Sequence, residues 1–348
     1  MIAQKELLRR LGIDFPIILA PMGGGPGTPE LAAAVSNAGG LGSLAGSYWT
    51  PEEILNKVGE TRRLTERPIC VNLFAGGFDR PADVDAAPML AILGEVHSAL
   101  GLPPPVLPSL TRDPFPKQFE AVLEARPEVF SFTFGALEPD AISKLHARGM
   151  TVLGTATTIE EGRILADTGV DAVIAQGAEA GAHRGTFTVH FEQAMVPTLE
   201  LVRGIAQFAA VIASGGIMDG RDIASMLSHG ASAVQLGTAF LRSPECGAAV
   251  AYKQAIAGAA RDTTVVTRAF SGRPARGIRN TFIEKLEGRE GAILPYPVQN
   301  TLTRQMRTAA AKLGEAGFLS LWAGQGVSRS RELPAAELVA QLINECEY

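Results

Sequence analysis

The segment Ala172-Val-Ile-Ala-Gln-Gly-Ala-Glu-Ala-Gly-Ala-His-Arg-Gly185 joins a short apolar run to a glycine-rich loop that contains one histidine. The run Ala172–Ala175 is continuous and does not alternate with polar residues, which is typical of a parallel strand covered on both faces. Glycines let the backbone after the strand approach a ligand closely. The segment therefore predicts a buried strand whose end carries chemistry through Gln176 and His183.

Apolar runs of the same kind recur along the chain, and helix signals separate most of them. The eight runs are Pro16–Ala20, Leu41–Leu44, Ile69–Leu73, Val129–Phe134, Thr151–Gly154, Ala172–Ala175, Ala210–Ala213 and Ala233–Leu236. Thr28 and Thr50 each precede a proline and a glutamate, as at capped helix starts, and Asp219 can cap a helix that Gly230 ends.

A strand and a helix repeated eight times predict an α/β fold with a closed (β/α)₈ barrel, the TIM barrel. The alternative is an open, doubly wound sheet. The barrel is favoured because the count is eight and because Gly23-Gly-Gly-Pro-Gly27 after the first run does not match the dinucleotide fingerprint G-x-G-x-x-G.

Two long segments interrupt the repeat. Residues 75–126 contain a predicted helix near Pro88–Leu100, followed by the proline-rich stretch Leu102–Pro116. Residues 243–321 are too long for one closing helix, so we expect a smaller, mostly helical second domain or lid inserted after strand eight. The expected division is a barrel at 1–242, the second domain at 243–321, and a C-terminal segment at 322–348 that closes the barrel.

Composition excludes several classes of function. The net charge of −5 over 348 residues argues against nucleic acid as a partner, and residues 268–279, where arginines gather, are more readily interpreted as a solvated face than as an anion-binding loop. No run is long enough to span a membrane, and no signal peptide begins the chain. The three cysteines form neither a disulfide framework nor a metal site, so we expect a cytoplasmic protein without a bound metal.

Two glycine motifs end the seventh and eighth strands of the predicted barrel. They are Ser214-Gly-Gly-Ile217 and Gln235-Leu-Gly-Thr238. Loops at these places commonly bind phosphate in barrels, where glycine N–H groups and a hydroxyl such as that of Thr238 act as donors. Tight strand-to-helix turns are the alternative, but the presence of both motifs on adjacent loops favours a phosphate site.

The polar residues at the strand ends suit a protein that holds a cofactor. The amides Asn72 and Gln176 can contact a flavin ring or ribityl chain, or else bond the neighbouring loop backbone. His183 lies in the glycine-rich loop and is a candidate base or substrate partner, with Glu179 either orienting it or serving the structure. The remaining histidines fall in helical or loop contexts, and we expect His97, His146 and His229 to be exposed.

Several motifs together resemble the nitronate monooxygenases, formerly called 2-nitropropane dioxygenases, and in particular their class I branch. The motifs cover nearly the whole chain and are Ala20-Pro-Met22, Ala34-Val-Ser-Asn-Ala-Gly-Gly-Leu-Gly-Ser43, Val71-Asn-Leu-Phe74, Gln176–Gly185, Ala213-Ser-Gly-Gly-Ile217, Gln235-Leu-Gly-Thr238, Pro295-Tyr-Pro-Val-Gln-Asn300 and Leu321-Trp-Ala-Gly-Gln325. One departure is Ala182, where many members of the family have a glycine.

The resemblance implies an FMN-dependent enzyme. It implies that FMN contacts Met22, Asn72, Gln176, Gly181, Gly215, Gly216, Gln235, Leu236, Gly237 and Thr238, and that His183 faces the substrate. The implied substrates are alkyl nitronates, notably propionate 3-nitronate, and in some cases nitroalkanes, which O₂ and the flavin convert to a carbonyl compound and nitrite. A monomer or homodimer without nucleic-acid or membrane partners is expected.

Three alternatives remain open at this point. A flavin-dependent enoyl-acyl-carrier-protein reductase shares the barrel and a similar Glu-Ala-Gly-x-His segment, and a nicotinamide:quinone reductase of the same superfamily is a further enzyme. A flavin-binding protein without turnover belongs to a different class of function, which His183 disfavours.

Overall fold

Each of the eight predicted runs forms a strand in the computed structural model, which describes residues 2–78, 84–109 and 113–346. The strands are β1 (Ile17–Leu19), β2 (Gly42–Ala45), β3 (Ile69–Phe74), β4 (Val129–Thr133), β5 (Thr151–Ala156), β6 (Ala172–Gln176), β8 (Val211–Ser214) and β9 (Ala233–Leu236). They form one sheet in the order β1-β9-β8-β6-β5-β4-β3-β2, and every pairing is parallel.

Backbone hydrogen bonds join the two edges of this sheet. The N–H of Leu19 donates to the carbonyl of Leu41 at 2.8 Å, and the N–H of Leu41 donates to the carbonyl of Ile17 at 2.9 Å. The sheet is therefore a barrel, and the preference for a barrel over an open doubly wound sheet is confirmed.

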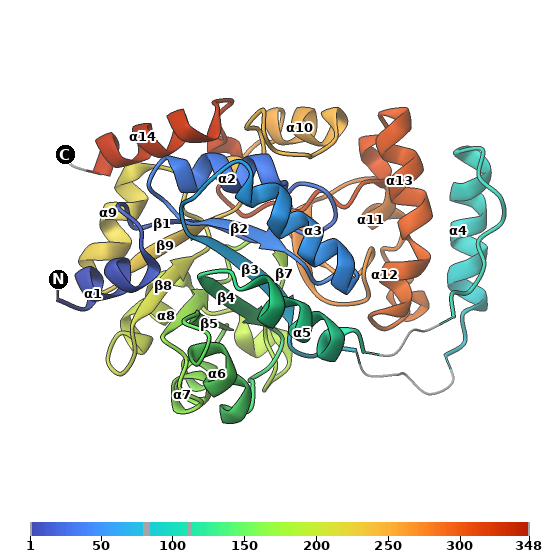
Figure 1. Cartoon of the computed structure of the whole chain (residues 1–348). Helices are drawn as coiled ribbons and strands as arrows, with labels where there is room; N and C mark the ends of the chain where they lie inside the picture. Colours follow the sequence, from blue (N-terminus) through green and yellow to red (C-terminus); the bar gives the residue numbers. More distant parts are fainter. Residues whose placement is uncertain (1, 79–83, 110–112, 347–348) are drawn as a thin grey trace.

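Helices lie around the barrel (Figure 1). They are α2 (Pro29–Asn37), α3 (Pro51–Arg62), α5 (Phe115–Ala125), α6 (Pro139–His146), α7 (Ile159–Asp167), α8 (Thr198–Ile205), α9 (Gly220–Ser228) and α14 (Ala335–Cys346). The predicted caps are confirmed, because Thr28, Thr50 and Asp219 each accept a hydrogen bond from a backbone N–H of the first helical turn.

The interior of the barrel is layered, since side chains along a strand alternate between its two faces. The lower layer is apolar and packs against Leu7 and Leu11 of α1 (Ile2–Leu11); it consists of Ile18, Cys70, Val129, Leu153, Ala172, Ile174, Ile212 and Ala233. Two residues further along four of these strands come Asn72, Gln176, Ser214 and Gln235. One end of the barrel is therefore closed by apolar contacts, while polar groups occupy the other end.

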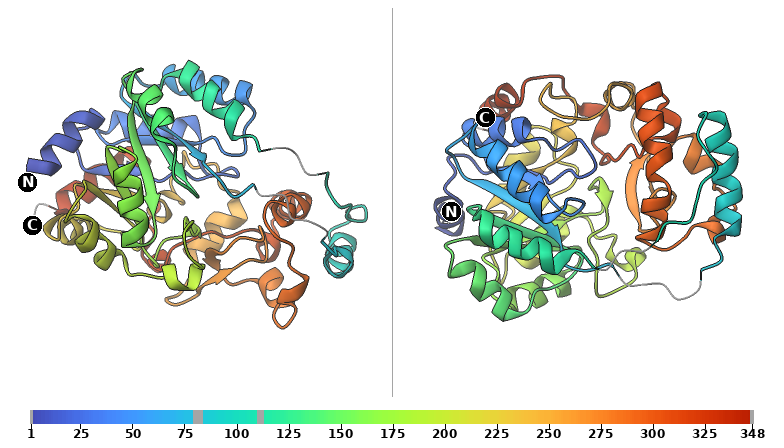
Figure 2. Two further views of the ribbon diagram at one scale, coloured as in Figure 1. Left: turned by 90° about the horizontal axis from the view of Figure 1, so that it is seen from below. Right: turned by 45° about the vertical axis from the view of Figure 1, so that its right-hand side comes forward.

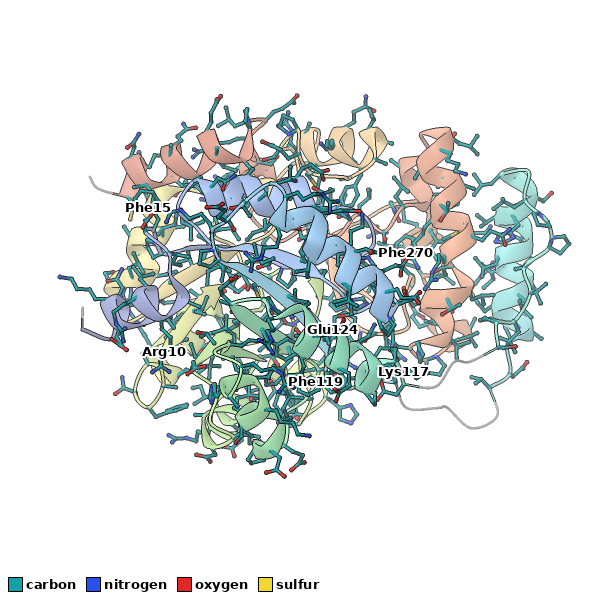
Figure 3. The ribbon with its side chains drawn as sticks, viewed as in Figure 1. Arg10, Phe15, Lys117, Phe119, Glu124 and Phe270 are labelled. Atoms are coloured by element: carbon teal, nitrogen blue, oxygen red, sulfur yellow. The ribbon has the colours of Figure 1, made fainter. Side chains whose placement is uncertain are left out.

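A second apolar cluster lies beside the barrel and gathers two distant parts of the chain. Met89 and Leu93 of α4 (Ala87–Ala99) pack with Phe270, Phe282 and Met306. Figures 1 and 2 show α4 beside α12 (Val298–Leu302) and α13 (Arg304–Leu313), and Phe270 is labelled in Figure 3. The cluster thus includes α4, which precedes β4, whereas the expected second domain contained residues 243–321 alone. That division of the chain stays a prediction.

The predicted helical segment also contains strands. β10 (Thr264–Thr267) and β11 (Ala275–Ile278) pair antiparallel, and β11 pairs with β7 (Ala182–His183) in the loop after β6. The remaining helices of this segment are α10 (Val250–Ala257) and α11 (Thr281–Lys285), with short 3₁₀ turns at η3 (Glu290–Ala292) and η4 (Ala316–Phe318). Other 3₁₀ turns lie outside the segment, at η1 (Phe191–Ala194), η2 (Thr238–Phe240) and η5 (Val327–Arg329).

Parts of the predicted long connection at 75–126 fall outside the described residues, namely 79–83 and 110–112. Its predicted helix is confirmed as α4, and α5 begins where the proline-rich stretch ends. Over the described part of the chain, no helix has the length and apolar character needed to cross a membrane.

The closing helix α14 provides a test of the fold. Leu338 is 1% exposed and lies in the main apolar core, and α14 contacts α2 and α9. Leu338→Ala is expected to lower the free energy of unfolding by roughly 2–5 kcal/mol, because it leaves a cavity in this core. The exposed Gln341 on the same helix is the control, and Gln341→Ala is expected to change it by less than about 0.5 kcal/mol. Urea denaturation measures both, and equal effects would contradict the assigned packing.

Candidate active site

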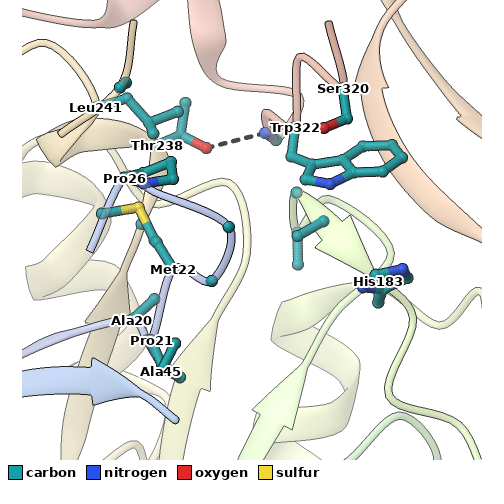
Figure 4. Close-up of a pocket in the computed structure, with 18 of the residues that line it drawn as sticks. Ala20, Pro21, Met22, Pro26, Ala45, His183, Thr238, Leu241, Ser320 and Trp322 are labelled. Carbon is teal, nitrogen blue, oxygen red and sulfur yellow. Dashed lines mark hydrogen bonds between the residues drawn. The ribbon is translucent and has the colours of Figure 1, made fainter. Parts of the chain in front are cut away.

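A cavity of about 640 Å³ opens at the polar end of the barrel, within the usual size range of ligand pockets. All the residues predicted for the site line it: Met22, Asn72, Gln176, Gly181, His183, Gly215, Gly216, Gln235, Leu236, Gly237 and Thr238. Figure 4 shows Met22 and Thr238 on one side of the cavity, opposite His183 and Trp322. The residues expected at the strand ends are thus grouped around one cavity. Their roles toward a ligand are proposed below.

The two amides of the floor are held by defined hydrogen bonds. Asn72 is buried, and its Nδ2 donates to Ser131 Oγ on the neighbouring strand β4 at 2.9 Å. Gln176 Nε2 donates to the carbonyl of His183 at 3.0 Å, and its Oε1 accepts from the N–H of Gly185 at 2.8 Å. Gln176 therefore fixes the loop that carries His183 by bonding the neighbouring loop backbone, which is the alternative to a flavin contact. Its side chain also lines the cavity.

A buried arginine holds the start of the same loop. Arg184 is 1% exposed, and its guanidinium donates to the carbonyls of Gln176, Gly177 and Ala194. Burial lowers the pKa of Arg184 to about 10, which leaves it charged at neutral pH. The loop thus closes around a fixed cation whose two terminal nitrogens donate to backbone carbonyls.

A buried carboxylate holds the next part of the loop. Glu161 of α7 accepts six hydrogen bonds, from the N–H and hydroxyl groups of Thr157 and Thr188, the hydroxyl of Thr186 and the N–H of Phe187. Burial raises the pKa of Glu161, but these donors outweigh it and the net pKa is lowered. The carboxylate form is therefore the one that the loop requires.

Glu179 has a structural role. Its carboxylate accepts from the N–H and the hydroxyl of Thr198 at the start of α8, at 2.9 and 2.7 Å. The structural alternative for Glu179 is therefore the observed one, and the orientation of His183 comes from another residue.

His183 is oriented by the second sheet. Its strand β7 pairs with β11, and its Nε2 lies 2.8 Å from Ser271 Oγ. Aromatic rings enclose the imidazole, with centroids 5.8 to 6.3 Å away; they belong to Phe74, Phe134, Tyr296 and Trp322. Ser271 comes from a distant part of the chain, and sequence patterns did not indicate it.

The hydrogen bonds of Ser271 favour one nitrogen of His183 as the site of the proton in the ligand-free cavity. Ser271 Oγ lies 3.0 Å from the carbonyl of Arg273 and accepts from the N–H of Arg273 at 3.2 Å. All of these groups are satisfied only when the single hydroxyl proton goes to that carbonyl and His183 Nε2–H donates to Oγ. Nδ1 then carries a lone pair and has no partner among the described residues.

The cavity is strongly cationic although the protein is acidic. Burial of the His183 ring lowers its pKa to about 3, and the nearby guanidinium groups of Arg273 and Arg307 add to this effect. The described residues that line the cavity include Arg304, Arg307 and Lys312 but no aspartate or glutamate. The site therefore combines a neutral imidazole with an electrostatic environment that favours anions.

Two residues at the cavity have backbone conformations that are uncommon for non-glycine residues. Phe134 has φ 74° and stacks beneath the guanidinium of Arg273, whose Cζ lies 3.6 Å from the ring centroid. Ala182, next to His183, has φ 63°. Such conformations cost energy and cluster at functional sites. A glycine in place of Ala182 would relieve the second.

The loops after β8 and β9 fit a phosphate-bearing ligand. Gly215 and Gly216 have φ 126° and 75°, which favour glycine, so backbone can line the cavity there. Thr238 Oγ1 accepts from the N–H of Gly324 at 2.9 Å, the dashed line in Figure 4, so its own proton is free to be donated. This donor set and the size of the cavity fit the flavin mononucleotide that the sequence resemblance implies.

Two expectations about charged and polar residues were wrong. Residues 268–279 are not a solvated face as a whole, because Ser271 and Arg276 are buried and Arg276 Nε donates to the carbonyl of Ala178. His97 is 1% exposed instead of exposed, because its Nδ1 bonds the carbonyl of Pro103. The described residues contain no group of three or more histidine, cysteine, aspartate or glutamate side chains that could hold a metal ion.

The protonation of His183 can be tested by NMR. With a pKa of about 3, the ring is expected to stay neutral from pH 8 to pH 5, with the proton on Nε2. The free energy of unfolding should fall as the pH drops below about 6.5, where the unfolded chain takes up a proton that folded His183 refuses. Nitrogen-15 shifts of labelled histidine, assigned with His183→Asn, report the charge of the ring and the nitrogen that carries its proton. Ser271→Ala is expected to abolish the preference for Nε2. Titration of His183 near pH 6.5 would contradict the assignment.

Comparisons with known proteins show the family of the chain. A family model described as nitronate monooxygenase matches residues 5–345. The chain is 44% identical over 348 residues to the nitronate monooxygenase of Pseudomonas aeruginosa, with 97% of each chain covered.

Two solved structures also match the chain over nearly its whole length. The chain matches a nitroalkane oxidase from Streptomyces ansochromogenes with a TM-score of 0.90 and 38% identity, covering 98% of each chain. FabK from Thermotoga maritima matches with a TM-score of 0.76 and 28% identity, covering 98% of this chain and 96% of that chain. The family implies a flavin and an oxidoreductase activity. The chain belongs to the nitronate monooxygenase family.

Proposed function

We propose that the protein binds FMN and oxidises alkyl nitronates, notably propionate 3-nitronate, with O₂ as the electron acceptor. The carbon–nitrogen bond is broken, and the products are a carbonyl compound and nitrite. The observation that carries this proposal is the pairing of a neutral His183 with a cationic cavity whose described lining contains no carboxylate. Such a site favours an anion over a neutral substrate.

The residues that would hold FMN occupy two parts of the cavity. Gly215, Gly216 and Thr238 would bind the phosphate, and the amides of Asn72 and Gln235 would face the polar edge of the ring or the ribityl chain. Gln235 is available for this, because the only hydrogen bond that its side chain makes to another described residue is a long one, 3.5 Å to Ser214 Oγ. FMN, when bound, would accept an electron from the nitronate and pass it on to O₂.

His183 is proposed to orient the nitronate. Removal of a proton from a neutral nitroalkane would create an imidazolium that burial and two guanidinium groups oppose, so a substrate that arrives deprotonated suits the site better. A nitronate oxygen at Nδ1 requires the proton on that nitrogen. The 2.8 Å contact with Ser271 permits this, because the Ser271 hydroxyl can turn and donate to Nε2.

The cofactor is tested on purified protein. It is expected to be yellow and to release FMN, identified by mass. Thr238→Val removes a donor to the phosphate and is expected to raise the Kd of FMN roughly 10- to 100-fold, the effect of one hydrogen bond to a charged group. Thr238→Ser keeps the hydroxyl and should bind FMN as the wild type does. Release of FAD, failure of the apoprotein to take up FMN, or a normal Kd for Thr238→Val would contradict the proposal.

The substrate is tested by anaerobic reduction of the bound flavin. Propionate 3-nitronate and propyl-2-nitronate are expected to bleach its absorbance rapidly in a stopped-flow instrument, because the cavity attracts anions. NADH and NADPH are expected to act slowly. Rapid reduction by a nicotinamide without a response to nitronates would instead support an enoyl or quinone reductase. His183→Asn, which should retain FMN, tests the role of the imidazole in orienting the nitronate.

A further inference from the structure

Arg307 of α13 is a half-buried cation without an anionic partner among the described residues. It lines the cavity, and its Nη2 donates to the carbonyl and the Oδ1 of Asn300 at 2.6 and 3.0 Å. Its Nε is buried and has no acceptor. Burial lowers the pKa of Arg307 to about 10, so it stays charged at neutral pH.

A charge in this position is costly unless something neutralises it. A buried ion without a counter-ion is strongly unfavourable, and proteins normally pair it. The nearest compensating groups are neutral: the phenol of Tyr48 interacts with Arg307, and burial raises the pKa of that phenol above its ordinary value. Tyr296 adds a second phenol beside Tyr48. A ligand is therefore the remaining source of a negative charge on the cavity side.

Arg307 lies on the side of the cavity where the substrate is expected. Its charge acts on both His183 and Tyr48. The proposed phosphate site is formed by other elements, the loops after β8 and β9, where Thr238 is fixed by Gly324. Arg304 and Lys312, which are more exposed, continue the positive charge along α13 at the cavity.

We propose that Arg307 binds a second anionic group of the substrate, a carboxylate on the carbon chain that bears the nitronate. The inference rests on the proposed function and adds the residue that selects among nitronates. A guanidinium suits this task because it stays charged and presents planar donors that match a carboxylate. Tyr48 and Tyr296 help to exclude water from the pair formed by Arg307 and the carboxylate. His183 contacts the nitronate group at the other end of the substrate.

The test compares two nitronates that differ in the second charge. Propionate 3-nitronate carries a carboxylate, and propyl-1-nitronate carries a methyl group in its place. Arg307→Met is expected to lower kcat/KM for propionate 3-nitronate about 100-fold, the scale of a lost buried charge pair, and to change the value for propyl-1-nitronate less than about threefold. Arg307→Lys should restore part of the loss. Arg203→Met, on the exposed face of α8, controls for net charge and should leave both values unchanged.

Equilibrium binding provides a second readout that does not depend on turnover. Malonate carries carboxylates but no nitronate, and its Kd is measured from the change it causes in the flavin spectrum. The wild type and Arg203→Met should bind malonate, and Arg307→Met should bind it at least tenfold more weakly. An equal loss of kcat/KM on both nitronates, or an unchanged Kd for malonate, would overturn the assignment of Arg307. A wild type that oxidises neither nitronate would overturn the proposed function, while malonate would still decide whether Arg307 binds a carboxylate.

Discussion

The antiparallel pairing of β7 with β11 is the contact on which the site depends. It is short, joining Ala182 and His183 to Arg276 and Ala275, yet it connects the loop after β6 to a segment that follows the whole barrel. Through it Ser271 reaches His183, and Arg273 reaches Phe134. Without this pairing the barrel would still close, but the imidazole would lose the groups that set its tautomer and its charge.

Much of the fold could be predicted because parallel strands buried on both faces appear in the sequence as continuous apolar runs. The alternation of side chains then places Asn72, Gln176 and Gln235 in one layer, so local patterns were enough to gather the residues that line the cavity. The second sheet was missed because its strands are short and because β11 pairs with β7, which lies far away in the sequence. The same distance hid Ser271 and Arg307, which no local motif connects to His183. His97 was misjudged because its environment depends on Pro103, in the irregular segment that follows its helix.

Two kinds of buried charge serve different purposes in this molecule. Glu161 accepts six hydrogen bonds and the terminal nitrogens of Arg184 donate to three backbone carbonyls, and these contacts hold the loop around His183. Arg307 lines the cavity instead, and its side chain donates to Asn300 alone among the described residues. Glu161 and Arg184 therefore serve the structure of the loop, whereas Arg307 has few hydrogen-bond partners and lies at the cavity.

The cluster formed by α4 with Phe270, Phe282 and Met306 bears on how the chain is made. During synthesis α4 leaves the ribosome before β4, whereas its apolar partners follow β9. Closing so long a loop is entropically unfavourable early on, and contacts between distant segments form late in folding. The apolar face of α4 therefore stays exposed until nearly the entire chain has been translated. This helix is the part of the protein for which a nascent-chain chaperone has the longest time to act.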